Sequence, residues 1–262
     1  MDLAGLREYQ PGDDVRYMDW NVTARLDTPY VREYVEDREI TAWFLLDLSP
    51  SVDFGTVETE RVKRTVLIDF VATLARLLTR RGNRVGAIFY GNTIERVVPA
   101  RGGRDQVLHL IDTLMSHPHL QSAPFTDLTP LLEAAQNTVK RRSLVFVISD
   151  FICAPGWERP LSLLHRRHEA IAVRLFDPRE VELPDAGPLI MQDAETGQQL
   201  FVDTHDAAFR RRFHDAAQRR EAEVALAFKR SGVEALALST EDDLVRAIVR
   251  MATIRRRSRR RR

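Results

Sequence analysis

Short apolar runs recur along the chain, and each has the length and composition of one buried β-strand. They cover residues 41–47, 84–90, 143–149, 168–176 and 233–239. A further strand is expected at 94–100, because Gly91-Asn92 forms a turn pair directly after the second run. This strand would lie antiparallel to its predecessor at the edge of a sheet.

Between these runs, apolar side chains recur three and four positions apart, the spacing of one face of a helix. The expected helices cover residues 58–81, 104–116, 128–141 and 205–230, with a last helix from Thr240 to about Ile254. In the first of them, Phe70 and Leu74 are expected to face the sheet. Two short strands between residues 189 and 202 flank a turn at Glu195-Thr196-Gly197 and predict an inserted β-hairpin.

Strands that alternate with helices are typical of a parallel sheet covered on both faces. The sequence therefore predicts the α/β class, with a doubly wound, mostly parallel sheet of Rossmann-like order. We expect one α/β domain over residues 41–254. A charged segment, residues 1–40, precedes it and is expected to pack on its core.

Composition excludes several classes of protein. The chain has 262 residues, of which 44% are hydrophobic, enough for a sizeable core. A single cysteine, Cys153, excludes a disulfide framework and multi-cysteine metal sites. No uncharged apolar run approaches the roughly 18 residues that cross a bilayer, and the first ten residues lack the pattern of a secretion signal. These features favour a soluble, cytoplasmic protein.

The formal net charge of +1 hides an asymmetry. The last eight residues, Arg255–Arg262, hold seven arginines and one serine. Without them, 32 of the 39 basic side chains remain against 38 acidic ones, so the body carries a charge of −6. We expect residues 255–262 to form a disordered tail, because like charges repel one another and no apolar side chain is present to bury. Such a tail can attract polyanions.

Polar residues follow two of the buried strands. Asp47, Ser49 and Ser51 come at the end of and just after the run 41–47, and Asp150 follows 143–149. Carboxyl ends of parallel strands form the ligand crevice of an open α/β sheet, so these side chains are expected to meet. Oxygen-only ligands suit a hard cation such as Mg²⁺ or Mn²⁺. Thr126, which lies before the helix 128–141, is a plausible further ligand.

In this order, Asp47, Ser49, Ser51, Thr126 and Asp150 resemble the metal-ion-dependent adhesion site of von Willebrand factor A domains. The chain departs from that pattern at two positions. Phe125 stands where a glycine usually precedes the threonine, and Phe151 where a glycine often follows the last aspartate.

The segment 1–40 carries a second, narrower resemblance, to the signature of the domain of unknown function 58 family. The matching residues are Arg7-Glu8-Tyr9, Pro11-Gly12-Asp13-Asp14, Arg16, Asp19-Trp20, Thr23-Ala24-Arg25 and Val31-Arg32-Glu33. This resemblance implies a bacterial or archaeal protein with a von Willebrand factor A-like fold. It further implies a metal-dependent protein-binding partner of a MoxR-type AAA+ ATPase, acting in the assembly or maturation of other proteins.

Other hypotheses stay open at this point. The charged residues of the signature could form an ion-pair and aromatic clamp around Tyr9, Trp20 and Tyr34, or could bind a partner directly. The main hypothesis is a non-enzymatic module whose metal receives a carboxylate from a client protein. The alternatives are nucleic-acid or anionic-surface binding through Arg255–Arg262, and a metal-dependent hydrolase that uses Asp150 or Asp127 to activate water. Neither a phosphate-binding glycine loop nor a G-x-S-x-G nucleophile elbow is present.

Overall fold

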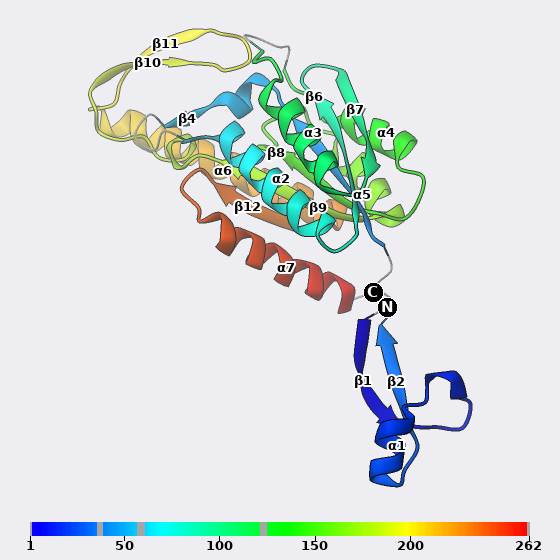
Figure 1. Ribbon diagram of the computed structural model, residues 1–262. Coiled ribbons are helices and arrows are strands. Elements are labelled where there is room, and N and C mark those ends of the chain that lie inside the picture. Colours follow the sequence, from blue (N-terminus) through cyan, green and yellow to red (C-terminus); the bar gives the residue numbers. More distant parts are fainter. Residues whose placement is uncertain (1, 36–38, 57–60, 121–124, 261–262) are drawn as a thin grey trace. The chain divides into compact units, whose positions relative to one another are not determined.

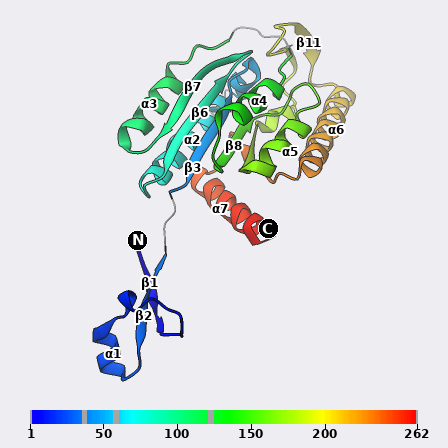
Figure 2. The same cartoon turned by 90° about the vertical axis from the view of Figure 1, so that its right-hand side faces the viewer.

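The computed structural model describes residues 2–35, 39–56, 61–120 and 125–260 (Figures 1 and 2). The chain divides into two compact units, Met1–Glu39 and Ile40–Arg262. Each unit is described separately below.

The larger unit is built on a six-stranded sheet with the order β12-β9-β8-β3-β6-β7. Its strands are β3 (Thr41–Asp47), β6 (Arg84–Tyr90), β7 (Ile94–Arg101), β8 (Leu144–Ser149), β9 (Glu169–Phe176) and β12 (Ala235–Ser239). Neighbouring strands are parallel, except that β7 pairs antiparallel with β6 at one edge. The predicted sheet, with its antiparallel edge strand, is confirmed.

Helices cover both faces of this sheet (Figure 2). On one face, α2 (Lys63–Thr79), α3 (Arg104–Met115) and α7 (Leu244–Arg260) enclose a core that contains Phe44, Phe70 and Leu74. On the other face, α4 (Thr129–Thr138), α5 (Glu158–Arg167) and α6 (Ala207–Ser231) pack on the alternate strand residues. No helix in the described part of the chain combines the length and apolar composition needed to cross a bilayer.

Three helices differ from the sequence prediction. The first expected helix begins at Lys63 instead of residue 58, because residues 61–62 pair as β5 with β4 (Gly55–Thr56). Helix α5 was not expected, since it buries only Leu161 and Leu164 among its ten residues and carries Pro160 in its first turn, where proline is tolerated.

The third difference concerns the C-terminal tail. Helix α7 continues to Arg260 instead of ending near Ile254, so helix replaces disorder over most of residues 255–262. Arginine is a good helix former, and the Arg255 guanidinium binds the Glu169 carboxylate at 2.6 Å. Residues 261–262 lie outside the described residues.

The predicted hairpin is present as β10 (Pro188–Gln192) and β11 (Gln199–Asp203), inserted between β9 and α6. Its base is closed by Thr204, whose backbone N–H and hydroxyl both donate to the Gly187 carbonyl oxygen, at 2.9 and 2.8 Å. In Figure 1 the hairpin is the yellow two-stranded arm, set apart from the six-stranded sheet.

The smaller unit is an antiparallel pair, β1 (Asp2–Glu8) with β2 (Tyr30–Val35), joined through α1 (Trp20–Leu26). Its signature residues pair with one another. Arg7 donates two hydrogen bonds of 2.7 Å to the Asp13 carboxylate. Asp19 caps α1 and binds Arg32 at 2.9 Å. Ion pairs therefore stabilise the segment internally, whereas its packing on the sheet stays a prediction.

Candidate functional site

The candidate site lies where the winding of the sheet reverses. From β3 the chain proceeds to β6 on one side, whereas β8, β9 and β12 lie on the other. Asp47 is the last residue of β3, and Asp150 directly follows β8. Both carboxylates are buried, at 0% and 1% exposure. Strand ends at a switch point bound the ligand crevice of open α/β sheets, so topology alone brings these two residues together.

Asp47 is a buried carboxylate with no cationic partner in the described part of the chain. One oxygen accepts a hydrogen bond from the Ser49 backbone N–H at 3.0 Å, and the other accepts from the Ser149 hydroxyl at 2.6 Å. No described basic side chain forms an ion pair with it. Burial, together with the nearby Asp150 charge, raises the pKa of Asp47 to about 6. The surroundings therefore disfavour the ionised form.

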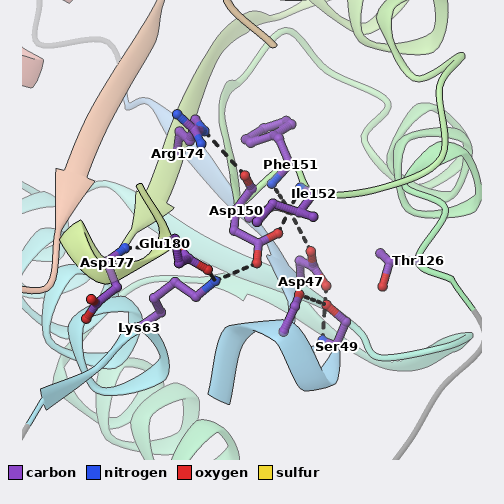
Figure 3. Close-up of polar contacts among 12 residues, drawn as sticks. Asp47, Ser49, Lys63, Thr126, Asp150, Phe151, Ile152, Arg174, Asp177 and Glu180 are labelled. Carbon is purple, nitrogen blue, oxygen red and sulfur yellow. Dashed lines mark hydrogen bonds and ion pairs between the residues drawn. The ribbon is translucent and has the colours of Figure 1, made fainter. Parts of the chain in front are cut away.

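Asp150, in contrast, has a buried counter-ion. The Lys63 ammonium at the start of α2 lies 2.7 Å from one Asp150 oxygen and 2.7 Å from Glu180, as Figure 3 shows. The other Asp150 oxygen accepts from the Ile152 N–H at 3.0 Å. Burial alone would raise the pKa of Asp150, but Lys63 together with the hydrogen bonds from Ile152 and Ser51 outweighs burial and lowers it. Lys63 is itself fully buried, and its two carboxylate partners raise its pKa.

The two serine hydroxyls meet beside these carboxylates. Residues 50–53 form the short 3-10 helix η2, with Ser49 as its N-cap residue. This turn folds Ser51 back, so that the Ser49 and Ser51 hydroxyl oxygens lie 3.2 Å apart. The Ser51 hydroxyl also stabilises the charge of Asp150 by a hydrogen bond. The structure thus brings four of the five expected ligands, Asp47, Ser49, Ser51 and Asp150, into one cluster.

Thr126, the fifth expected ligand, has a different partner. Its hydroxyl donates to one oxygen of Glu195 at 2.5 Å, and its backbone N–H donates to the other at 2.8 Å. In Figure 3 Thr126 stands apart from the Asp47–Ser49 group, with no bond drawn to it. Glu195 comes from the turn of the β10–β11 hairpin and is buried. Burial raises the pKa of Glu195 against the effect of the Thr126 bonds, and the Asp150 charge adds to the rise.

The two phenylalanines that replace expected glycines behave differently. Phe151 has φ = +57°, in the left-handed region that glycine adopts without strain. Its ring packs against Trp157 and Phe228, with centroids 5.0 and 4.7 Å away. This packing offsets the backbone strain and keeps the loop after Asp150 in its bent form. Phe125, before Thr126, is 62% exposed.

The charges around the candidate site do not balance. We call Asp47, Asp150, Glu180 and Glu195 the acidic cluster; among the described residues, Lys63 pairs with two of these carboxylates, Asp150 and Glu180, whereas Asp47 and Glu195 form no ion pair. Among the described residues, no three His, Cys, Asp or Glu side chains group as a metal site, so a cation here would need hydroxyl ligands as well. Carboxylate and hydroxyl oxygens fit a hard cation such as Mg²⁺. Asp47, Ser49 and Ser51 would hold it, with Thr126 and Asp150.

Residues suggested for other chemistry are engaged differently. The Asp127 carboxylate accepts from the Thr129 N–H at 2.8 Å at the start of α4, which is a structural role. Burial, followed by the charge of Asp47, raises the pKa of the Cys153 thiol far above its ordinary value. A thiol with a raised pKa is a poor nucleophile, because the thiolate is the reactive form.

Sequence reasoning missed four residues of the site: Lys63, Ser149, Glu180 and Glu195. Lys63 falls within the predicted helix 58–81, where a lysine is expected to be solvated. Ser149 directly precedes Asp150, a position from which a hydroxyl can reach a neighbouring strand end, and this adjacency was a usable signal. Glu195 lies 69 residues from Thr126, and no local pattern connects the two.

Solved structures with the same fold include BatB from Bacteroides thetaiotaomicron, with a TM-score of 0.54 and 12% identity over 83% of this chain and 99% of that one. An aerotolerance-related membrane protein from Bacteroides fragilis aligns over the same shares, with a TM-score of 0.52 and 12% identity. Both likenesses support the von Willebrand factor A-like fold.

Relatives in sequence include the uncharacterized protein Rv1480 from Mycobacterium tuberculosis. It is 39% identical over 253 residues, which cover 96% of this chain and 78% of the relative. The family model described as protein of unknown function DUF58 matches residues 5–223. The chain therefore belongs to the DUF58 family, with a core of the von Willebrand factor A type.

Proposed function

We propose that this protein is a non-enzymatic binding module that captures an acidic side chain of a partner protein through a divalent cation. The observation that carries the proposal is the state of Asp47: a fully buried carboxylate next to Asp150, with hydrogen-bond donors but no ion pair among the described residues. A buried charge is costly unless it is paired or coordinates a metal. A cation at the strand ends would supply the missing charge.

Binding is favoured over catalysis by the state of the other carboxylates. Hydrolysis would need a carboxylate free to take a proton from water. Asp150 is engaged by Lys63 and by the Ile152 N–H, and Asp127 by the Thr129 N–H. A bound Mg²⁺ ion keeps ligand positions open to groups from outside the protein. A partner aspartate or glutamate is the ligand that such a position would accept.

Family resemblance supplies the rest of the proposal. The client offers the carboxylate, and a MoxR-type AAA+ ATPase in the same bacterial cytoplasm acts on the pair during assembly or maturation of the client. Arg7, Asp13, Asp19 and Arg32 belong to the signature that resembles this family, and they form ion pairs with one another inside the smaller unit. The ATPase would therefore recognise the smaller unit, and the client the metal site.

A calorimetric titration of the whole chain with Mg²⁺ and Mn²⁺ tests the metal site. At a metal concentration about tenfold above Kd, linkage stabilises the protein by roughly 1.4 kcal/mol, and Tm rises by ~3–6 °C for a domain of this size. Asp47→Ala abolishes the shift, and Ser49→Ala weakens it without changing charge. Asp112→Ala, at an exposed aspartate on α3, is the matched control and keeps the full shift.

The ATPase partnership has its own test. The whole chain, immobilised, is mixed with the purified MoxR-type ATPase of the same organism, with Mg²⁺ or with chelator. Retention of the ATPase by wild type, and its loss when Arg7 and Arg32 are both replaced by Ala, are expected. Absence of retention in every condition would overturn the partnership and leave the metal site standing. Conversely, absence of Mg²⁺ and Mn²⁺ binding at millimolar concentration would refute the metal-dependent mechanism.

A further inference from the structure

The β10–β11 hairpin brings a carboxylate of the protein itself to the candidate site. Glu195 is buried, and its two oxygens accept the hydroxyl and the backbone N–H of Thr126, at 2.5 and 2.8 Å. Of the five expected ligands, Thr126 is the one whose described bonds go to Glu195 and not to the Asp47–Ser49–Ser51 group. A carboxylate from outside the α/β core thus occupies the Thr126 side of the site.

The turn of this hairpin is built to present Glu195. Asp193 accepts hydrogen bonds from the backbone N–H groups of Glu195 and Thr196, at 3.1 and 2.7 Å, and from the Thr196 hydroxyl at 2.8 Å. Gly197 has φ = +70°, a conformation that closes the turn and suits glycine. These bonds lie within the turn and do not involve Thr126, so the turn itself preorganises the glutamate.

Between its two ends the hairpin has little packing. Its base is closed by the bonds between Thr204 and Gly187, and its tip is bound through Glu195. Along the strands, Ile190, Leu200 and Phe201 are 63%, 61% and 71% exposed. A two-stranded ribbon with few buried side chains is of low local stability. The bonds between Glu195 and Thr126 therefore largely decide whether the tip stays on the site or leaves it.

The position of Glu195 suits a carboxylate that shares an ion with Thr126. Neighbouring ligands of an octahedral Mg²⁺ ion, each about 2.0–2.1 Å from it, lie about 2.9 Å from each other. The Glu195 and Thr126 oxygens are already within hydrogen-bond distance. A second carboxylate, from a partner, would need this same side of the site.

We infer that Glu195 is a tethered stand-in for the partner's carboxylate, so that the hairpin must release Thr126 before an acidic partner binds. The inference rests on the proposed function. It adds how partner binding at the metal site is regulated and in what form the partner presents its carboxylate. That ligand is an acidic residue displayed on a tight turn, the form in which Glu195 is displayed. Because the competitor is covalently attached, its effective concentration is in the millimolar range. The apparent affinity for a partner is then the intrinsic affinity multiplied by the fraction of molecules whose hairpin is open.

The test uses the whole chain and a fluorescent cyclic peptide with the sequence of residues 188–203, in the presence of Mn²⁺. Wild type binds this peptide weakly, because its own hairpin occupies the position. Glu195→Gln keeps the shape of the side chain and removes its charge, so its affinity for the peptide rises by about tenfold or more. Chelator abolishes the binding, and a peptide with glutamine at the position of Glu195 binds neither protein.

Two further variants control the experiment. Glu133→Gln makes the same charge change at an exposed glutamate on α4 and binds the peptide as wild type does. Replacing residues 193–198 by Asn-Gly, a two-residue turn that suits a hairpin, removes Glu195 while keeping the paired strands, and should behave as Glu195→Gln does.

The outcomes separate the two hypotheses. Unchanged peptide affinity in both Glu195→Gln and the shortened hairpin, with Mn²⁺ binding intact by calorimetry, overturns the stand-in role and leaves the metal site in place. Tighter peptide binding in both variants that persists in chelator also overturns it, because the peptide would then occupy a site without the ion. Absence of Mn²⁺ binding in wild type and variants overturns the proposed function itself.

Discussion

Replacing Asp47 by asparagine would measure the charge imbalance of the acidic cluster directly. Asparagine has the same shape, its carbonyl oxygen can accept from the Ser49 N–H, and its amide can donate to the Ser149 oxygen. The substitution therefore removes the charge while keeping partners for both side-chain atoms. Any change in the free energy of unfolding then reports the cost of holding that charge in the folded protein.

The magnitude follows from the pKa of Asp47, which rises from 3.8 to about 6 on folding. A raised carboxyl pKa means that the folded state holds the proton more tightly than the unfolded state does. Stability from this group is therefore highest at low pH and is lost as pH rises between about 4 and 6. Two pKa units correspond to a loss on the order of 3 kcal/mol. Above this pH range and without metal, the free energy of unfolding of Asp47→Asn should exceed that of wild type by up to this amount.

Urea unfolding in chelator, repeated from about pH 4 to about pH 8, is the assay. The stability difference between Asp47→Asn and wild type should be near zero at the acid end and grow with pH. Asp150 has a lowered pKa, so its contribution to stability has the opposite pH dependence. Both proteins contain Asp150, so subtracting the wild-type curve of stability against pH from the Asp47→Asn curve largely cancels this contribution. Asp112→Asn, at an exposed aspartate, should show no such growth. A difference that is flat with pH, or that favours wild type at the alkaline end, would refute the reasoning.

Three further predictions concern the core and the C-terminus. At Phe151, where φ is +57°, alanine should be less stable than glycine by about 1 kcal/mol in urea unfolding, the reverse of the usual order; equal stability would contradict the strained backbone. Phe70→Ala and Leu74→Ala, on the buried face of α2, should each lower the free energy of unfolding by about 2–5 kcal/mol. Leu77→Ala, at a 45% exposed position, should lower it far less. Similar losses at all three positions would show a wrong helix register. Deleting residues 257–262 should remove most retention on heparin with little change in Tm, and retention that survives the deletion would place the polyanion site elsewhere.

The central strands of the sheet could be predicted because they are buried on both faces. Residues 41–47 and 143–149 are almost entirely apolar, so their composition alone identifies them. Helix α5 could not be predicted, because a helix of ten residues with two buried leucines has little periodicity. The N-terminal strands β1 and β2 were not expected either. They pair with each other through the backbone, and the ion pairs Arg7–Asp13 and Asp19–Arg32 tie them to the segment between them; a hydrophobic pattern records neither kind of contact.

The residues of the site likewise divide into those that the sequence could predict and those that it could not. Asp47 and Asp150 end adjacent parallel strands, so the fold class is sufficient to bring them together. Ser49 and Ser51 follow within four residues of Asp47, so local chain geometry is enough to place them near it. Lys63 and Glu195 could not be predicted as site residues, because each contacts the site through a bond between residues far apart in the sequence. The Lys63–Asp150 pair spans 87 positions along the chain, and no local rule selects one partner over such a distance.

The left-handed backbone at Phe151 has a consequence for how the family diverges. A glycine at this position needs no support, whereas a phenylalanine is tolerated only with the rings of Trp157 and Phe228 against it. The three positions are therefore coupled, and an exchange at one alters which residues are acceptable at the other two. Across homologous sequences, phenylalanine at 151 should co-occur with aromatic residues at 157 and 228. Lineages that retain glycine should vary freely at both of those positions.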